Sequence, residues 1–184
     1  MPKIIIGLTG EIAAGKGTAA AYLENKYGAQ VFGFSRPLRD IAQRLYIEET
    51  RPNLAAISSI MRAQFGSDLI SRVITEDIKH STADIVVLDG IRRMPDIETA
   101  SKLPGFELVS IITDEQIRYN RLINRRQNQD DQHKTFEQFK LDHQAEADKN
   151  IPEVMAQAKN IIDNNGDFEN LYKQLDTLIQ NLIK

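Results

Sequence analysis

The sequence predicts an α/β protein in three layers, with about five mostly parallel strands and helices on both faces of the sheet. Two observations lead to this fold class. Short apolar runs alternate along the chain with longer segments of helical periodicity, as in parallel sheets that are covered on both sides. The first run, 4–8, is apolar throughout, as expected of a strand that is buried on both faces. The 184 residues fit one domain, 1–184.

Three strands and four helices are expected in the first half of the chain. The strands are the apolar runs 3–8, 29–34 and 84–90. The helices are 16–27, one that follows Ser35 and is broken at 51–53, 53–65 and 68–80. Ser35 and Asp68 are of residue types that commonly cap helices, and each directly precedes a helical pattern. Pro52 is expected to break the chain between two helices, because proline cannot continue the hydrogen-bond ladder of a helix interior.

The second half predicts two further strands and five helices. The strands are 106–112 and 159–163, and the helices are 95–102, 114–127, 135–150, 152–158 and 168–183. Asp114 is expected to cap the helix that follows it. Thr135 and Gln138 have the spacing of a capping box. The polar run 127–134 is expected to be a loop.

Composition excludes several classes of protein. The net charge of −3 gives no overall attraction to nucleic acid or to anionic membranes, so nucleic acid is not an expected partner. There are no cysteines, which excludes disulfides and thiolate metal sites and fits a reducing compartment. No run reaches the eighteen or so apolar residues of a membrane span, and no signal peptide is apparent. We therefore expect a cytoplasmic protein.

A glycine-rich loop, 10–18, joins the first predicted strand to the first predicted helix. Gly10 and Gly15 can take backbone angles that are closed to other residues, so consecutive N–H groups can turn inward around a phosphate. The N-terminus of the next helix adds partial positive charge, and Lys16 adds a full charge for the β- and γ-phosphates. The predicted nucleotide-binding residues of this loop are Gly10, Ala13, Ala14, Gly15, Lys16, Gly17 and Thr18.

The position after Lys16 departs from the common phosphate-binding pattern, which has Ser or Thr there. Here the residue is Gly17, and the hydroxyl comes one position later, at Thr18. Gly17 cannot bind Mg²⁺ through a side chain, which leaves Thr18 as a secondary candidate ligand. The Gly-Lys-Gly-Thr ending resembles nucleoside monophosphate kinases of the adenylate kinase kind.

Asp89 lies at the end of an apolar strand, at the sheet edge where ligands bind in parallel α/β proteins. A carboxylate there can hold Mg²⁺, directly or through water, beside the phosphates of the loop. The alternative is an aspartate that only caps the next turn. Together with the phosphate loop, the position favours the metal role.

Arginines follow two of the predicted strands. Arg36 and Arg39 come after the second strand, and Arg92 and Arg93 follow Asp89. A guanidinium group binds phosphate oxygens through two parallel hydrogen bonds, and phosphoryl transfer needs cations on the acceptor phosphate to offset its repulsion of the donor. The alternative for each pair is a solvated surface.

A third group of arginines lies on one predicted helix, where Arg118, Arg121 and Arg125 recur at helical spacing. The polar run after this helix suits a lid over bound phosphates, at 121–140. The turn 164–166, which includes Asn165, could contact a purine base, or it could be a plain turn. The three histidines show no ligand spacing.

The chain resembles P-loop nucleotide kinases of the nucleoside monophosphate kinase superfamily. Three segments are similar to phage-type deoxynucleoside monophosphate kinases: 34–40, 61–68 with Arg72, and 86–93. The C-terminal half, from Arg121 through Gly166, resembles dephospho-CoA kinases instead, as does 7–10. The resemblance implies the three-layer P-loop kinase fold, with a helical acceptor-binding segment at 35–80 and a short lid. It also implies ATP as phosphoryl donor, Mg²⁺, and a monomer or homodimer.

The resemblance also implies residue roles. Lys16 and the backbone of 10–18 would bind the ATP phosphates, Thr18 would contact the α- and β-phosphates, and Asp89 would organise Mg²⁺. The acceptor phosphate would be held by Arg36, Arg39, Arg72 and Arg92. Arg121 and Arg125 would be the base-side and lid arginines, so the implied catalytic residues are Lys16, Asp89, Arg92, Arg121 and Arg125.

The leading hypothesis is a kinase that transfers the γ-phosphate of ATP to a nucleoside or deoxynucleoside monophosphate, a small-molecule acceptor. The second is dephospho-CoA kinase, whose acceptor is a ribose hydroxyl. A third reading is a slow ATP-binding switch or assembly factor that acts through a partner. A GTPase is disfavoured because the Asn-Lys-x-Asp guanine signature is absent, and a transporter ATPase because no LSGGQ-like segment occurs.

Overall fold

The computed structural model describes residues 2–124, 132, 134–142 and 149–183. These residues form a five-stranded sheet in the order β2-β3-β1-β4-β5, with every pair of neighbouring strands parallel. The strands are β1 (Ile4–Thr9), β2 (Gln30–Gly33), β3 (Ile85–Asp89), β4 (Phe106–Ile112) and β5 (Asn160–Asp163). The predicted α/β class and number of strands are confirmed.

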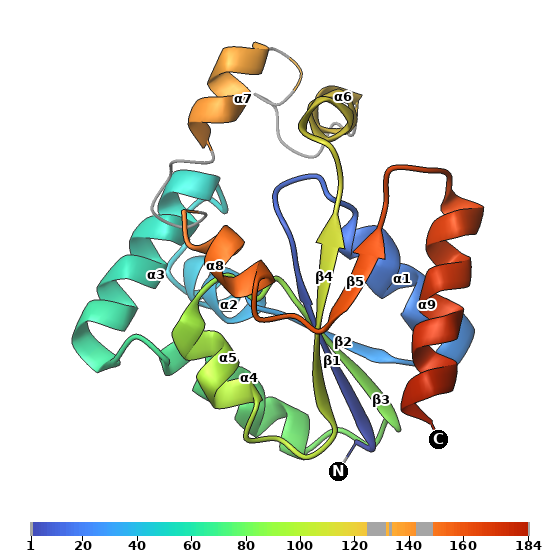
Figure 1. Cartoon of the computed structure of the whole chain (residues 1–184). Coiled ribbons are helices and arrows are strands. Elements are labelled where there is room, and N and C mark those ends of the chain that lie inside the picture. The colour runs from blue at the N-terminus through green and yellow to red at the C-terminus, as the bar shows by residue number, and fades with distance from the viewer. Residues whose placement is uncertain (1, 125–131, 133, 143–148, 184) are drawn as a thin grey trace.

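Helices cover both faces of the sheet (Figure 1). They are α1 (Lys16–Tyr27), α2 (Arg36–Arg44), α3 (Arg51–Phe65), α4 (Leu69–Lys79), α5 (Met94–Ala100), α6 (Glu115–Asn124), α7 (Phe136–Asp142), α8 (Ile151–Met155) and α9 (Phe168–Leu182). Helices α1 and α9 cover one face, where they pack on Ile4, Ile6 and Leu8 of β1. Helices α2 to α5 and α8 cover the other face, toward which Ile5 points. Two apolar cores therefore enclose the sheet, as the uninterrupted apolar run of β1 predicts.

Helices α6 and α7 do not belong to either layer. They stand beyond the carboxyl ends of β4 and β5, over the edge at which β1 ends (Figure 1). Among the described residues, no helix is both long enough and apolar enough to span a membrane.

Three expectations about the ends of helices differ from the structure: the role of Pro52 and the caps at Ser35 and Asp68. Pro52 lies in the first turn of α3, where its missing N–H costs nothing, and the Thr50 hydroxyl accepts a hydrogen bond from the Asn53 amide. Pro52 thus begins a helix, whereas α2 has already ended at Arg44. Neither Ser35 nor Asp68 makes a capping hydrogen bond through its side chain. The Asp68 carboxylate instead pairs with Arg72, at 3.2 Å.

The capping box is confirmed at the start of α7. The Gln138 side chain accepts from the Thr135 amide at 2.8 Å, and the Thr135 hydroxyl accepts from the Gln138 amide at 3.2 Å. The remainder of the predicted helix 135–150 cannot be compared as a whole, since 143–148 lie outside the described residues. The predicted helix 152–158 is shorter in the structure, where α8 begins at Ile151 and ends at Met155.

Candidate functional site

The parallel register brings three strand ends into one row. Leu8 of β1 lies opposite Asp89 of β3, and Asp89 lies opposite Gly33 of β2. The backbone continues these links beyond the strands: the Gly90 amide donates to the Leu8 carbonyl at 3.2 Å, and the Phe34 amide donates to the Asp89 carbonyl at 3.1 Å. The segments that leave the three strands therefore begin side by side at one edge.

The loop after β1 has the backbone shape that phosphate binding requires. Gly10, Ala13 and Gly15 all have positive φ, at 148°, 60° and 105°. At Gly10 the close approach is to backbone, because an added Cβ would lie 2.6 Å from the Ile111 carbonyl oxygen. Lys16 folds across the loop and donates to the carbonyls of Gly10 at 2.6 Å and Glu11 at 2.9 Å. The ammonium group is thus held where phosphates would enter.

The ends of β4 and β5 support the loop from behind. Asn164 is buried and its amide donates to the Ala14 carbonyl at 2.7 Å, while the Thr113 hydroxyl donates to the same oxygen at 3.0 Å. A Cβ at Gly15 would collide with the Asn164 amide nitrogen. Thr113 and Asn164 directly follow predicted strands, but their contacts with the loop were not predicted. A polar residue directly after an apolar strand is the one feature of the sequence that could have indicated them.

Asp89 is the carboxylate in the row of strand ends. Its Oδ1 atom is buried and has no hydrogen-bond partner among the described residues. Burial raises the pKa of Asp89, and the positive charges of Lys16 and Arg92 oppose that rise. A buried carboxylate oxygen without a donor suits Mg²⁺, which prefers oxygen ligands and keeps much of its water. The described residues contain no cluster of three or more His, Cys, Asp or Glu side chains, so water and phosphate would supply the other ligands.

The four arginines predicted for the acceptor fall into two pairs. Arg36 begins α2 next to the row of strand ends and is exposed, and Arg92 is near enough to affect the pKa of Asp89. Arg39 and Arg72 are in ion pairs, Arg39 with Glu49 at 2.6 Å and Arg72 with Asp68 at 3.2 Å. Their acceptor role stays a prediction, and it would require these pairs to be shared with or exchanged for a phosphate.

The arginines predicted to share one helical face beside the lid differ in burial. Arg118 is buried, whereas Arg121 is half-buried; Arg125 lies outside the described residues. Arg121 donates from Nη2 to the Asn164 carbonyl at 2.9 Å, and its Nη1 is buried with no partner in the described part of the chain. Burial lowers the pKa of Arg121. One guanidinium nitrogen is thus left unsatisfied by the described residues.

Asn165 uses its side chain within the protein. The amide oxygen accepts from the Asp114 amide at 2.7 Å, and the amide nitrogen donates to Asp163 at 2.8 Å. These bonds join the end of β5 to the start of α6. The Asn165 backbone amide also donates to Asp163, at 2.9 Å. The predicted contact of this turn with a base therefore stays a prediction.

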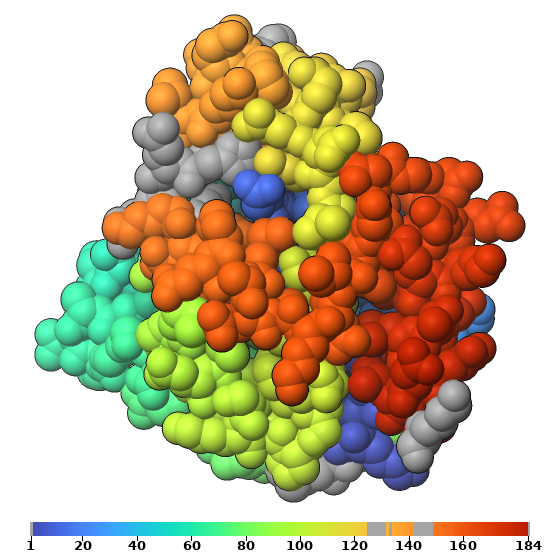
Figure 2. Space-filling view, in the orientation of Figure 1, coloured from blue at the N-terminus to red at the C-terminus, as the bar shows by residue number. Residues whose placement is uncertain are grey.

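Helix α7 is fastened to α6 by aromatic side chains. Tyr119 packs against Phe136 and Phe139, with ring centroids 5.2 and 5.7 Å apart, and its hydroxyl donates to the Lys134 carbonyl at 3.0 Å. Figure 2 shows a hollow bordered by α6, α7 and α8, with dark-blue atoms from the N-terminal part of the chain at its floor. The described part of the predicted lid, 121–140, thus forms a wall beside the phosphate loop.

Comparison with known proteins agrees with this geometry. The family described as AAA domain matches residues 9–140. A UPF0200 protein of Saccharolobus islandicus is 28% identical over 186 residues, which cover 99% of this chain and 95% of that protein. A UPF0200 protein of Methanoregula boonei is 30% identical over 127 residues, which cover 68% and 69%.

Among solved structures, a shikimate kinase from Bacteroides thetaiotaomicron superposes with a TM-score of 0.66 at 16% identity, over 98% of this chain and 99% of that one. At this identity the likeness concerns the fold alone. The phosphate loop, the all-parallel sheet and these matches agree with one another. The chain therefore belongs to the AAA domain family and to the UPF0200 family, and it has the fold of a P-loop kinase.

Proposed function

We propose that the protein transfers the γ-phosphate of ATP to a nucleoside or deoxynucleoside monophosphate. The observation that supports the proposal is the row formed by Leu8, Asp89 and Gly33, because the segments that follow these three strands begin at one edge. The phosphate loop follows β1, the Asp89 carboxylate ends β3, and Arg36 follows β2. A donor site, a metal ligand and an acceptor cation would thus lie in sequence across neighbouring strands.

The chemistry needs no strong general base. An oxygen of the acceptor phosphate attacks the γ-phosphorus, the bond from that phosphorus to the bridging oxygen breaks, and ADP leaves with the electron pair. Lys16 would stabilise the charge on the transferred group, and Arg36 and Arg92 would hold the acceptor phosphate against repulsion by the donor. Bound Mg²⁺, held through Asp89, would neutralise the β- and γ-oxygens. Arg121 would reach the nucleotide through its unsatisfied Nη1.

The experiment is a measurement of ADP formation from ATP and Mg²⁺ with a panel of acceptors. The panel contains the ribo- and deoxyribonucleoside monophosphates, dephospho-CoA and, as a hydroxyl acceptor taken from a structural neighbour, shikimate. We expect one or a few monophosphates to raise the rate at least about tenfold over the acceptor-free rate, because positioning of the two phosphates supplies most of the acceleration. Acceleration by dephospho-CoA or shikimate alone would contradict the proposal.

Dephospho-CoA kinase is the second candidate, and one observation favours it. The buried, unpartnered Oδ1 of Asp89 is suited to accept a proton from a hydroxyl nucleophile, since burial raises the pKa of that carboxyl group. Silence of the whole panel in a protein that still binds ATP would favour a partner-dependent switch instead.

Replacement of Asp89 should separate stability from function. We expect Asp89→Asn to raise the free energy of unfolding of the metal-free protein by about 1 kcal/mol at neutral pH, because it removes a buried charge of which one oxygen, Oδ1, lacks a donor. Because burial raises the pKa of Asp89 in the folded protein, the carboxyl group ionises at a lower pH in the unfolded chain than in the folded one. Asp89 therefore destabilises the native protein as the pH rises above 3.8, its ordinary pKa, and has no such effect below it. Denaturant titrations in EDTA at several pH values measure this.

The same substitution should lower the activity and raise the Mg²⁺ concentration that is needed for half-maximal rate. An unchanged Mg²⁺ titration would remove Asp89 from the metal site, whereas a loss of stability would show that its carboxylate has a donor in solution.

A further inference from the structure

A carboxylate occupies an unfavourable place in the phosphate loop. Glu11 follows Gly10 directly, and the carbonyl oxygens of both residues accept from Lys16. Its side chain is 31% exposed, so solvent screens it only in part. A negative charge beside bound phosphates repels them, by an amount that falls with distance and with the local dielectric. A positive charge near Glu11 would offset this repulsion when the loop binds a nucleotide.

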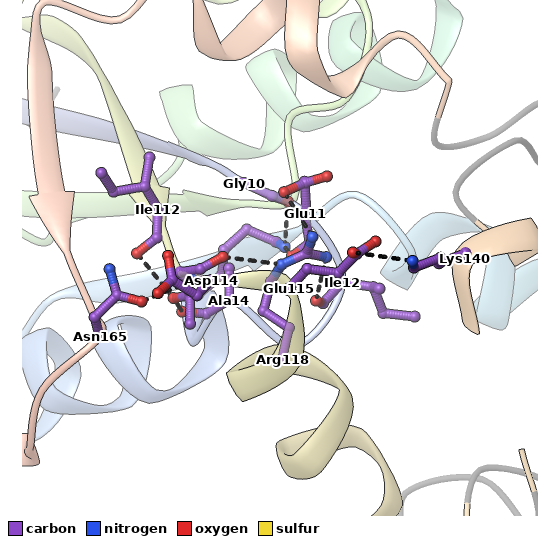
Figure 3. Close-up of polar contacts among 12 residues, drawn as sticks. Gly10, Glu11, Ile12, Ala14, Ile112, Asp114, Glu115, Arg118, Lys140 and Asn165 are labelled. Atoms are coloured by element: carbon purple, nitrogen blue, oxygen red, sulfur yellow. Dashed lines mark hydrogen bonds and ion pairs between the residues drawn. The ribbon is translucent and has the colours of Figure 1, made fainter. Parts of the chain in front are cut away.

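The offsetting charge comes from α6. Arg118 Nη2 lies 3.0 Å from Glu11 Oε2, and the arginine side chain is only 4% exposed (Figure 3). The same guanidinium donates from Nε to the Thr113 carbonyl at 3.0 Å and from Nη1 to the Ile12 carbonyl at 3.4 Å. Its carbon atom also lies 5.5 Å from the centroid of the Phe139 ring in α7. One side chain thus joins the phosphate loop, the end of β4 and both outer helices.

These contacts distinguish Arg118 from an arginine whose guanidinium group is free to bind a phosphate. All three nitrogens of its guanidinium already face acceptors of the protein, and the group is enclosed between the loop and α7. Burial lowers the pKa of Arg118, while Glu11 and Glu115 raise it, and arginine stays charged in either case. The buried cation and the carboxylate need each other, since either one alone is costly.

We propose that Arg118 is a positioning residue for the nucleotide: it cancels the charge of Glu11 in the phosphate loop and does not touch the ligand. The inference rests on the nucleotide site of the proposed function, but not on the identity of the acceptor. It predicts that Arg118 matters because Glu11 is present. A direct phosphate contact would matter whatever residue stood at position 11.

The test is a calorimetric titration with MgATP of four proteins: the native chain, Arg118→Gln, Glu11→Gln and the double variant. We expect Arg118→Gln to weaken ATP binding by about tenfold or more, because an unpaired carboxylate then faces the phosphates. Glu11→Gln should bind within about threefold of the native chain. The double variant should recover most of the loss. A double variant as weak as Arg118→Gln would overturn the proposal.

Two further proteins keep the test decisive. Lys26→Gln has the same change in net charge and breaks the exposed pair with Asp176 near the other end of α1, so its ATP affinity should not change. Arg118→Lys keeps the positive charge and should bind ATP within about threefold of the native chain. It replaces Arg118→Gln in the test if that variant does not fold. A loss of ATP affinity of about tenfold in Arg118→Lys would refute charge cancellation. A native chain that binds MgATP but phosphorylates no acceptor would refute the proposed function and leave this inference standing. A native chain that does not bind MgATP would refute both.

Discussion

Replacement of Lys16 by alanine should abolish phosphoryl transfer while the fold survives. The ammonium group is the one full positive charge that the phosphate loop itself carries, and it is held over the loop by the carbonyls of Gly10 and Glu11. In a complex with bound ATP this charge would turn toward the β- and γ-phosphates. Loss of one preorganised charge-stabilising group costs about 10²–10³ in rate, and the lysine should lie at or above that range. The measurement is the rate of ADP formation with the best acceptor of the panel.

The control for this variant is Lys26→Ala, a lysine of the same helix whose charge is paired with Asp176 at 2.7 Å. It should keep the native rate. Thermal unfolding of both variants should stay near that of the native chain, because partly exposed lysines contribute little to stability. A Lys16→Ala protein that retains more than about a tenth of the native rate would exclude the loop from catalysis, given the range above.

Gly10→Ala should be the most destabilising single change in the phosphate loop. Its φ of 148° is rare for any residue with a Cβ, and the added carbon would lie 2.6 Å from the backbone oxygen of Ile111. A backbone atom of a central strand cannot rotate away, so the strand or the loop must shift. We expect a loss of about 2–4 kcal/mol in the free energy of unfolding, from strain and overpacking together. Denaturant titration measures it.

Gly17 provides the matched control, since it lies in the same loop-to-helix segment. A Cβ there would meet no heavy atom within 4 Å, and the residue is the second of α1. Alanine should therefore leave the stability unchanged or raise it by up to about 1 kcal/mol, as glycine is a poor helix former. Equal stability of the Gly10→Ala and Gly17→Ala proteins would contradict the strain that is attributed to Gly10.

Much of the fold follows from local patterns in the sequence. Apolar runs without alternation predicted the parallel strands, and the glycine loop was recognisable because strand, loop and helix follow one another. Boundaries were less predictable. Pro52 is compatible both with the end of one helix and with the first turn of the next, and only the Thr50 cap decides between them.

The site was predictable where it depends on strand ends, and unpredictable where it depends on distant partners. Asp89 could be placed because parallel strands share an edge. Arg118 was grouped with the lid arginines of its helix, because helical spacing alone does not reveal Glu11, which is 107 positions away in the sequence and 3.0 Å away in space. Asn164 was missed as a support of the loop for the same reason. Arg121 and Lys16 keep their predicted roles as proposals.

The bond between Asn164 and the Ala14 carbonyl has a consequence for the order of folding. It closes a separation of 150 residues, so the loop that is synthesised among the first segments gains its last support from the final strand. In the described part of the chain, strand β5 pairs with β4 alone and forms an edge of the sheet. Nucleotide affinity should consequently develop late during folding, after the C-terminal strand has docked. A nucleotide would then stabilise the finished domain and leave its partly folded precursors unaided.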